Sequence, residues 1–153
     1  MPDRATAPIV GIALLLAVTA VLAGAVGSVA LGTTTPSSSP RAVVDLRVDA
    51  GADRLTFVHR GGDALDVGDL AVRVRIDGTP LDAQPPVPFF SASGFRPGPT
   101  GPFNSATDSR WAAGETASLA LAGTNDPTLA PGSTVAVTLS VNESVVAEVE
   151  ETA

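Results

Sequence analysis

The chain has no cysteine, lysine or tyrosine, and only one histidine, one methionine and one tryptophan among 153 residues. Without cysteine, neither a disulfide nor a thiolate metal site can form. One histidine cannot supply the several ligands of a typical zinc site. The sequence also has no G-x-S-x-G motif, which would indicate the nucleophile of a hydrolytic triad. We therefore expect no enzyme activity, no cofactor and no metal centre.

The basic residues are few and of one kind. All nine are arginine, against 16 acidic residues, for a net charge of −7. Nucleic acids and anionic lipid headgroups both need a basic face, so we expect no nucleic-acid partner. An acidic, lysine-free surface is typical of proteins that stay hydrated in concentrated salt, where the Debye length falls to about 3 Å at 1 M. A genome rich in G and C would also replace lysine with arginine, and both explanations stay open.

What the chain does have is a long apolar run at its N-terminus. Residues 5–32 carry no charge and are rich in Ala, Val, Leu and Gly. As a helix, Ile9 to Leu31 would measure about 35 Å, enough to cross a hydrocarbon core of about 30 Å. Pro8 is tolerated in a first turn, where its missing N–H has no helical partner. We predict a hydrophobic transmembrane or filament-core helix over residues 5–32, followed by a Ser/Thr/Pro linker over residues 33–42.

Three interpretations of this segment compete. It could be a secretory signal peptide cut after Ser28-Val29-Ala30, although the run exceeds the usual 7–15 apolar residues. It could be a single-pass membrane anchor with an extracellular head, although one arginine is thin evidence for topology. In the third, cleavage between Arg4 and Ala5 removes residues 1–4 as a leader and leaves the apolar helix as the mature N-terminus.

The third interpretation carries a family resemblance. The run Arg4-Ala5-Thr6-Ala7-Pro8-Ile9-Val10-Gly11 is similar to the start of haloarchaeal type IV pilins, in which R-A-x-x-P-[VI]-[IV]-G precedes the helix. The resemblance implies cleavage by prepilin peptidase after Arg4, storage of the helix in the membrane, and later packing against other pilin subunits.

Small residues recur every four positions along the same segment. At that spacing they form a stripe that allows another helix to approach closely. An Ala/Gly-rich segment also produces such stripes by chance, so both explanations stay open. The positions are Ala20, Gly24, Ser28 and Gly32.

Beyond the linker the hydrophobic pattern has period two. The clearest strand is 70–76, in which alternate apolar residues face one way and Arg73 and Arg75 face the other. Asp77-Gly78 reads as a hairpin turn. Further strands are expected at 44–48, 55–59, 116–122, 134–141 and 145–149. Six or seven short strands predict an antiparallel, Ig-like β-sandwich head over residues 43–153.

This region also carries landmarks of the same pilin family. The segments Leu55 to Leu65 and Asp69 to Val72 resemble its "H-x-G-G-D-x-L … D-L-x-V" pattern. Trp111 to Glu115 and Leu129 to Val135 resemble its "W-x-x-G-[DE]" and "L-x-P-G-[DS]-x-V" patterns.

Several further positions in the head carry expectations. Residues 83–110 hold six prolines and four phenylalanines, and so predict an ordered surface loop, a contact patch or a self-anchored segment. Asp63, Asp66 and Asp69 could hold Ca²⁺ or simply form an acidic turn. His59 is expected to be structural, with its ring bonded to loop backbone. Asn142-Glu143-Ser144 is an N-glycosylation sequon in a predicted turn.

Taken together, these features predict a structural subunit of an archaeal type IV pilus-like surface filament serving adhesion or surface contact. The alternative is a membrane-anchored extracellular binding module that does not polymerise. Both place the protein at the cell membrane, with a single pass and an extracellular head.

Overall fold

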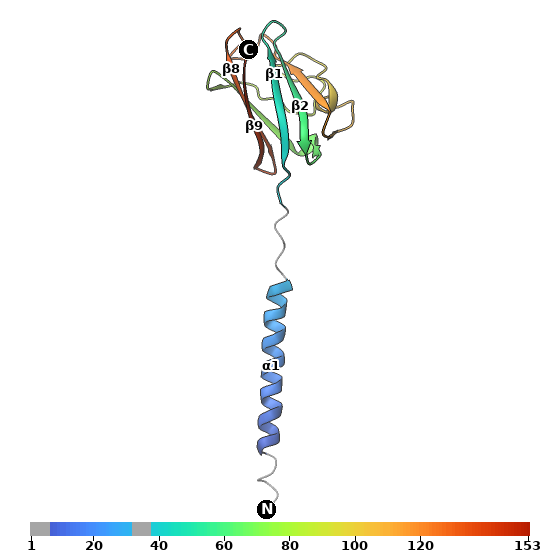
Figure 1. Cartoon of the computed structure of the whole chain (residues 1–153), viewed down its shortest axis with the longest axis vertical. Helices are drawn as coiled ribbons and strands as arrows, with labels where there is room; N and C mark the ends of the chain where they lie inside the picture. Colours follow the sequence, from blue (N-terminus) through green and yellow to red (C-terminus); the bar gives the residue numbers. More distant parts are fainter. Residues whose placement is uncertain (1–6, 32–37) are drawn as a thin grey trace, which may run out of the picture. The chain divides into compact units, whose positions relative to one another are not determined.

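The structure is a computed structural model that describes residues 7–31 and 38–153, with side chains in the N-terminal helix given for residues 8–23 (Figure 1). The chain divides into two compact units, Met1–Ser38 and Ser39–Ala153. The first contains helix α1, Ala7–Leu31. The second, which we call the head, is built from nine strands and two 3₁₀ turns.

Helix α1 forms where the apolar run predicts a helix. Ala and Leu are strong helix formers, and Pro8 sits in the first turn. Thr19 is the one polar side chain between residues 8 and 23, and its hydroxyl donates to the Leu15 carbonyl at 2.7 Å. That bond returns the hydroxyl to the helix's own backbone.

The predicted long membrane helix is overturned. Among the described residues, no helix combines the length and the hydropathy that a bilayer crossing needs. The predicted membrane helix over residues 5–32 and the single-pass location at the cell membrane are corrected accordingly. What stands of the predicted fold class is a β-rich domain with one N-terminal helix.

The head contains two larger antiparallel sheets and one small one. The first sheet has the strand order β1-β2-β7 and the second β5-β4-β8-β9, while β3 pairs with β6. The strands are β1 Ala42–Asp49, β2 Arg54–Gly62, β3 Leu65–Asp66, β4 Leu70–Ile76, β5 Thr79–Pro80, β6 Arg110–Trp111, β7 Thr116–Ala120, β8 Thr134–Val141 and β9 Ser144–Thr152. The 3₁₀ turns are η1 Val67–Asp69 and η2 Gly101–Phe103.

Alternation along the strands sets which side chains enter the core. In β4 the burial pattern is strictly alternating, with Arg73 and Arg75 exposed as the sequence predicts. The buried hydrophobic residues of β2, β4, β7 and β8 belong to one cluster, so the inner faces of both larger sheets share a single core. Phe57 and Leu139 are fully buried there.

Two tight turns join neighbouring strands of the second sheet. Asp77 and Gly78 have φ of 50° and 79°, and Asn142 and Glu143 have φ of 48° and 67°. Positive φ at both central residues of a two-residue hairpin matches the twist of the flanking strands. The predicted Asp77-Gly78 turn is thus present between β4 and β5.

The proline-rich segment 83–110 contributes to the core rather than lying over it. The segment contains η2 and Arg110, the first residue of β6. Its other strand-like pairings are isolated β-bridges, such as the one between Phe89 and Asn104. The Phe103 ring packs 5.3 Å from the Phe57 ring and 5.3 Å from Trp111. Proline prevents regular strands here, and the aromatic rings hold the segment in place instead.

Candidate functional site

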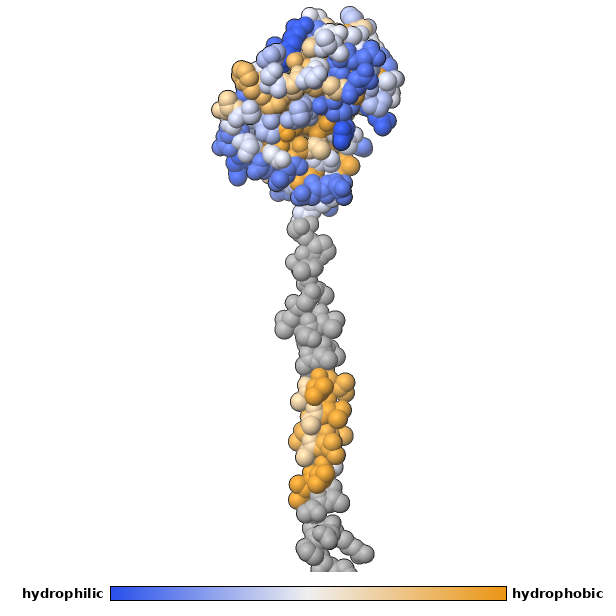
Figure 2. All heavy atoms as spheres, turned by 180° about the vertical axis from the view of Figure 1, so that it is seen from behind, coloured by the Kyte–Doolittle hydropathy of each residue, from blue (hydrophilic) through white to orange (hydrophobic). Residues whose placement is uncertain are grey.

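The apolar surface of α1 is the most unusual feature of the described chain. Its nine large apolar side chains between Ile9 and Leu22 are all more than half exposed, with Val21 at 72%. No acidic residue lies in its first turn and no basic residue in its last. The visible face of α1, where its side chains are described, is coloured hydrophobic in Figure 2, whereas the visible face of the head is mostly hydrophilic. A helix that is apolar all round normally has its surface covered.

The predicted helix-packing residues lie only partly within the described side chains. Ala20 is exposed on α1. Gly24 and Ser28 fall within the helix, but their side chains lie outside the described residues, as does Gly32. The predicted leader junction, Arg4 and Ala5, also lies outside the described residues.

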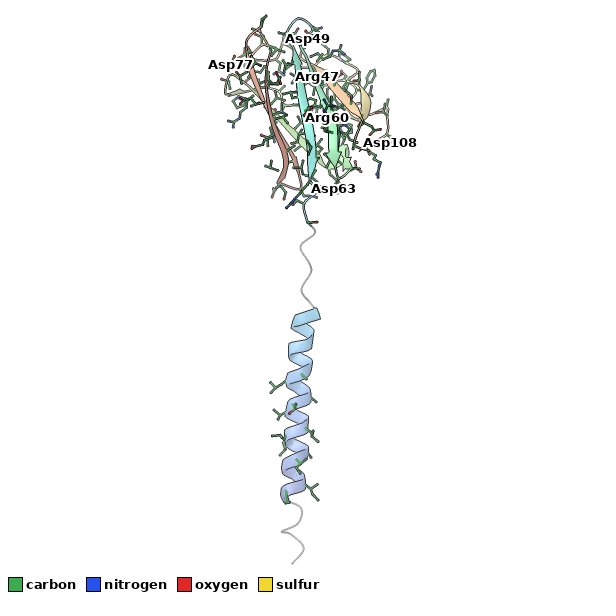
Figure 3. The ribbon with its side chains drawn as sticks, viewed as in Figure 1. Arg47, Asp49, Arg60, Asp63, Asp77 and Asp108 are labelled. Atoms are coloured by element: carbon green, nitrogen blue, oxygen red, sulfur yellow. The ribbon has the colours of Figure 1, made fainter. Side chains whose placement is uncertain are left out.

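The point where the chain enters the head is fixed by two reciprocal hydrogen bonds between Arg41 and Asp63, at a site that we call the entry clamp. It consists of Arg41, Gly62 and Asp63. The Arg41 N–H donates to Asp63 Oδ2 at 3.0 Å, and the Asp63 N–H donates to the Arg41 carbonyl at 2.7 Å. A Cβ on Gly62, which has φ of +96°, would lie 2.2 Å from that same carbonyl oxygen. Only glycine therefore fits at position 62, and in Figure 3 Asp63 lies at the end of the head where β1 begins.

His59 ties the entry clamp to the core. It is fully buried, and its Nε2 lies 2.9 Å from the Asp63 carbonyl oxygen, to which an N–H at that nitrogen donates. Its ring meets Trp111 edge to face, with centroids 5.4 Å apart. Trp111 Nε1 in turn donates to the Glu115 carbonyl at 3.1 Å. His59 Nδ1 is the one buried side-chain N or O atom without a hydrogen-bond partner among the described residues. The histidine thus bonds loop backbone, as predicted.

The three aspartates of the acidic turn do not converge on a common point. The Asp63 carboxylate accepts from Arg41, and Asp66 Oδ1 accepts from the Gly68 N–H at 2.9 Å as the N-cap of η1. Across the described residues, no three acidic or histidine side chains gather closely enough to hold a metal ion. Asp66 thus caps a turn, a role that Asp fills readily at turns and N-caps, and Asp63 belongs to the entry clamp.

Two side-chain amides that the sequence analysis did not single out, Asn125 and Gln84, hold the 83–110 segment. Asn125 is 2% exposed, and its amide bonds both backbone groups of Ala83 at 3.0 Å and the Gly94 carbonyl at 3.2 Å. The Gln84 side chain pairs with the N–H and carbonyl of Val74, as a neighbouring strand would. Contacts between residues 42 apart leave no periodic signal in a sequence.

The aromatic residues of the segment divide into anchors and one exposed ring. Phe89, Phe95 and Phe103 are buried, whereas Phe90 is 59% exposed. The anchoring role predicted for these aromatics is therefore seen for three of the four. Phe90 alone remains available for contact with other molecules.

Asn142 occupies the first central position of the β8–β9 turn and is exposed. The sequon thus lies in a turn, and occupancy by a glycan stays a prediction.

The head has an open groove of about 370 Å³ between β1 and β9. Both are edge strands of their sheets. Its lining includes Asp45, Arg47, Glu150 and Glu151, and Asp45 is already paired with Arg60 at 2.6 Å. Charged side chains on edge strands discourage pairing with foreign strands. No histidine, serine or threonine is in its lining, so the groove offers carboxylates and one guanidinium but no hydroxyl or imidazole.

Comparison with known proteins gives limited information. No family model matches the chain. The chain is similar to an uncharacterized protein of Archaeoglobus fulgidus, with 29% identity over 77 residues. The match covers 49% of this chain and 55% of the relative, so the chain spans about half the length of the curated relative it matches. This similarity is to an archaeal protein and assigns no activity.

Proposed function

We propose that the chain is a structural subunit of an archaeal type IV pilus-like surface filament, in which copies associate through α1 and expose their heads. The observation that carries the proposal is the apolar surface of α1, whose large side chains are all more than half exposed. The leader-like sequence around Arg4 and Ala5 supports it, and so does the archaeal source of the similar protein.

The magnitude of the exposed surface favours assembly. Full burial of a large aliphatic side chain contributes about 1.5–3 kcal/mol. For the nine exposed apolar side chains of α1, burial of half of this surface would contribute roughly 7–13 kcal/mol per copy. Such a contribution is of the same order as the roughly 4–15 kcal/mol that association costs in lost translational and rotational freedom, so burial of α1 can offset that cost. The small residues at Ala20, Gly24 and Ser28 would let neighbouring helices approach closely.

The head then serves as the exposed part of each subunit. It has its own core, an acidic surface and, among its described residues, no cluster of side chains that could hold a metal ion. The entry clamp would keep the first strand attached when the linker is pulled, because Arg41 bonds Asp63, whose carbonyl oxygen accepts from the buried His59. The function is therefore mechanical, and its partners are prepilin peptidase and other pilin subunits.

The proposal is tested by the mass of the mature N-terminus of the protein isolated from the cells that make it. A chain that begins at Ala5 is expected. A chain that begins at Leu31, or an uncut chain that begins at Met1, would contradict the proposal. In the first case the apolar segment would be a discarded signal peptide.

A variant pair sharpens the test. Arg4→Glu should block cleavage and abolish filaments, whereas the matched Arg54→Glu, on the exposed surface of β2, should leave both unchanged. Normal size and normal filaments in Arg4→Glu would show that the leader assignment is wrong.

A further inference from the structure

The outer face of the second sheet separates its charges into two rows. On β4 the exposed residues are Ala71, Arg73 and Arg75. On β9 the residues in register with them across β8 are Val145, Glu148 and Glu150. The central strand β8 contributes only small residues between the rows: Ala136, Thr138 and Ser140.

The register makes three cross-strand lines on this face, which we call the charge-row face. They are Arg75–Ala136–Glu150, Arg73–Thr138–Glu148 and Ala71–Ser140–Val145. A bulge between Leu139 and Ser140 shifts β9 by one residue and so places Val145, which is 57% exposed, on this face.

The two rows do not neutralise each other within one head. Adjacent strands lie about 4.8 Å apart, so the arginine and glutamate rows are separated by roughly 10 Å. The ion pairs of residues 39–153 are Arg60 with Asp45 and Arg96 with Asp53, and neither involves the charge-row face. Four charges therefore stand without an ion-pair partner on either side of a shallow neutral strip.

A second copy of the head complements this arrangement. A two-fold axis parallel to β8 exchanges the sides of the face, so the arginine row of one copy lies opposite the glutamate row of the other. Arg75 then faces Glu150, Arg73 faces Glu148 and Ala71 faces Val145, each twice. The small residues of β8 let the two sheets approach to the roughly 10 Å spacing of packed sheets. A two-fold axis perpendicular to the strands would instead set arginine against arginine.

We infer that the charge-row face is a two-fold interface between heads of two copies of this chain. The contact closes on itself, as isologous contacts do. Within the proposed filament it would therefore join a head of one assembly to a head of another. The inference concerns the head alone and does not depend on α1.

The test uses the head, residues 39–153, which forms a compact unit with its own core. The association of the heads is measured by sedimentation equilibrium at about 0.15 M salt. This salt concentration screens the repulsion between two acidic heads beyond roughly 8 Å and leaves direct ion pairs effective. We expect concentration-dependent dimers. A head that stays monomeric at millimolar concentration would overturn the inference.

Charge reversal identifies the face. Arg73→Glu with Arg75→Glu should weaken dimerisation at least tenfold, and so should Glu148→Arg with Glu150→Arg. The matched control is Arg47→Glu with Arg54→Glu, on exposed positions of the first sheet. Each arginine reversal lowers the charge by two, so the control and the first variant both move from −7 to −11. Equal weakening of dimerisation in the control and in Arg73→Glu with Arg75→Glu would show that net charge, not this face, governs association.

Mixing the two charge-reversed heads provides the decisive arm. One head then carries four glutamates and the other four arginines on the face, and their combined charge equals that of two unaltered heads. Heterodimers should form with the affinity of the unaltered pair, to within a few-fold. Heterodimers of this affinity would also show that both variants are folded. Failure to form heterodimers, with both variants folded by circular dichroism, would refute the interface. Because α1 is absent, neither result bears on filament assembly.

Discussion

Replacing Gly62 by alanine tests whether the entry clamp holds the first strand of the head. The new Cβ would lie 2.2 Å from the Arg41 carbonyl oxygen and 3.0 Å from the Ala42 Cα, both of them backbone atoms. Neither can move away as a flexible side chain can, so β1 must separate from the end of β2. That separation breaks the two hydrogen bonds between Arg41 and Asp63.

The expected loss of stability combines two contributions. An alanine held at φ of +96° costs about 1–2 kcal/mol. Each of the two broken hydrogen bonds contributes a net of roughly 0.5–1.5 kcal/mol. The sum is about 2–5 kcal/mol, and a domain of this size loses roughly 4 °C in Tm for each kcal/mol. The Tm of the head should therefore fall by roughly 8–20 °C.

Gly78→Ala is the matched control. Gly78 also has positive φ, at +79°, but nothing lies within 4 Å of its added Cβ. Its loss should be limited to the backbone strain of about 1–2 kcal/mol. Thermal unfolding compares the two variants, and hydrogen exchange of the Arg41 and Asp63 amides locates the damage. If the two variants lose equal stability and the amides of Gly62→Ala stay protected, the reasoning about the entry clamp is wrong.

Three further predictions follow from the described contacts. Asn125→Ala removes the amide that bonds Ala83 and Gly94, and chemical denaturation should show a loss of about 2–4 kcal/mol; a loss below 1 kcal/mol would contradict the anchoring role. Phe103→Ala should lower the free energy of unfolding by about 3–5 kcal/mol, whereas Phe90→Ser, at an exposed position, should change it by no more than about 0.5 kcal/mol. Equal effects of the two substitutions in thermal melts would mean that the burial of these rings is misassigned. Leu15→Glu places a charge on the apolar surface of α1 and should reduce sedimenting assemblies of the full chain at least tenfold without changing the Tm of the head; unchanged assembly would show that this surface is not used.

The sequence predicts the strands of the head well where alternation is regular. Residues 70–76 alternate strictly between aliphatic and polar or small side chains and end at Asp77-Gly78, so both the strand and its turn are found where expected. The pattern cannot reveal the two-residue strands β3 and β6, because alternation needs more residues than they contain.

The main errors of prediction arise from tertiary contacts and from the N-terminal helix. Phe103 belongs to the core because it packs against Phe57, 46 positions away in the sequence, and no local pattern records that contact. Asn125 looks like an ordinary turn residue until its amide is seen between two loops. Apolar composition predicted a membrane span over residues 5–32, but no helix among the described residues meets the length and hydropathy of a span.

The charge-row face is only partly visible in the sequence. The alternation of arginine on β4 and glutamate on β9 is visible in the sequence. Its meaning depends on the register through β8 and on the bulge beside Ser140, which only the fold supplies.

The central claim, assembly of copies through α1, is tested most directly by electron cryomicroscopy of the full chain after cleavage between Arg4 and Ala5. We expect helical filaments in which the α1 helices of neighbouring copies lie side by side and the heads project outward. Dispersed single copies at the same concentration, or filaments whose subunit contacts are made by heads alone, would contradict the account.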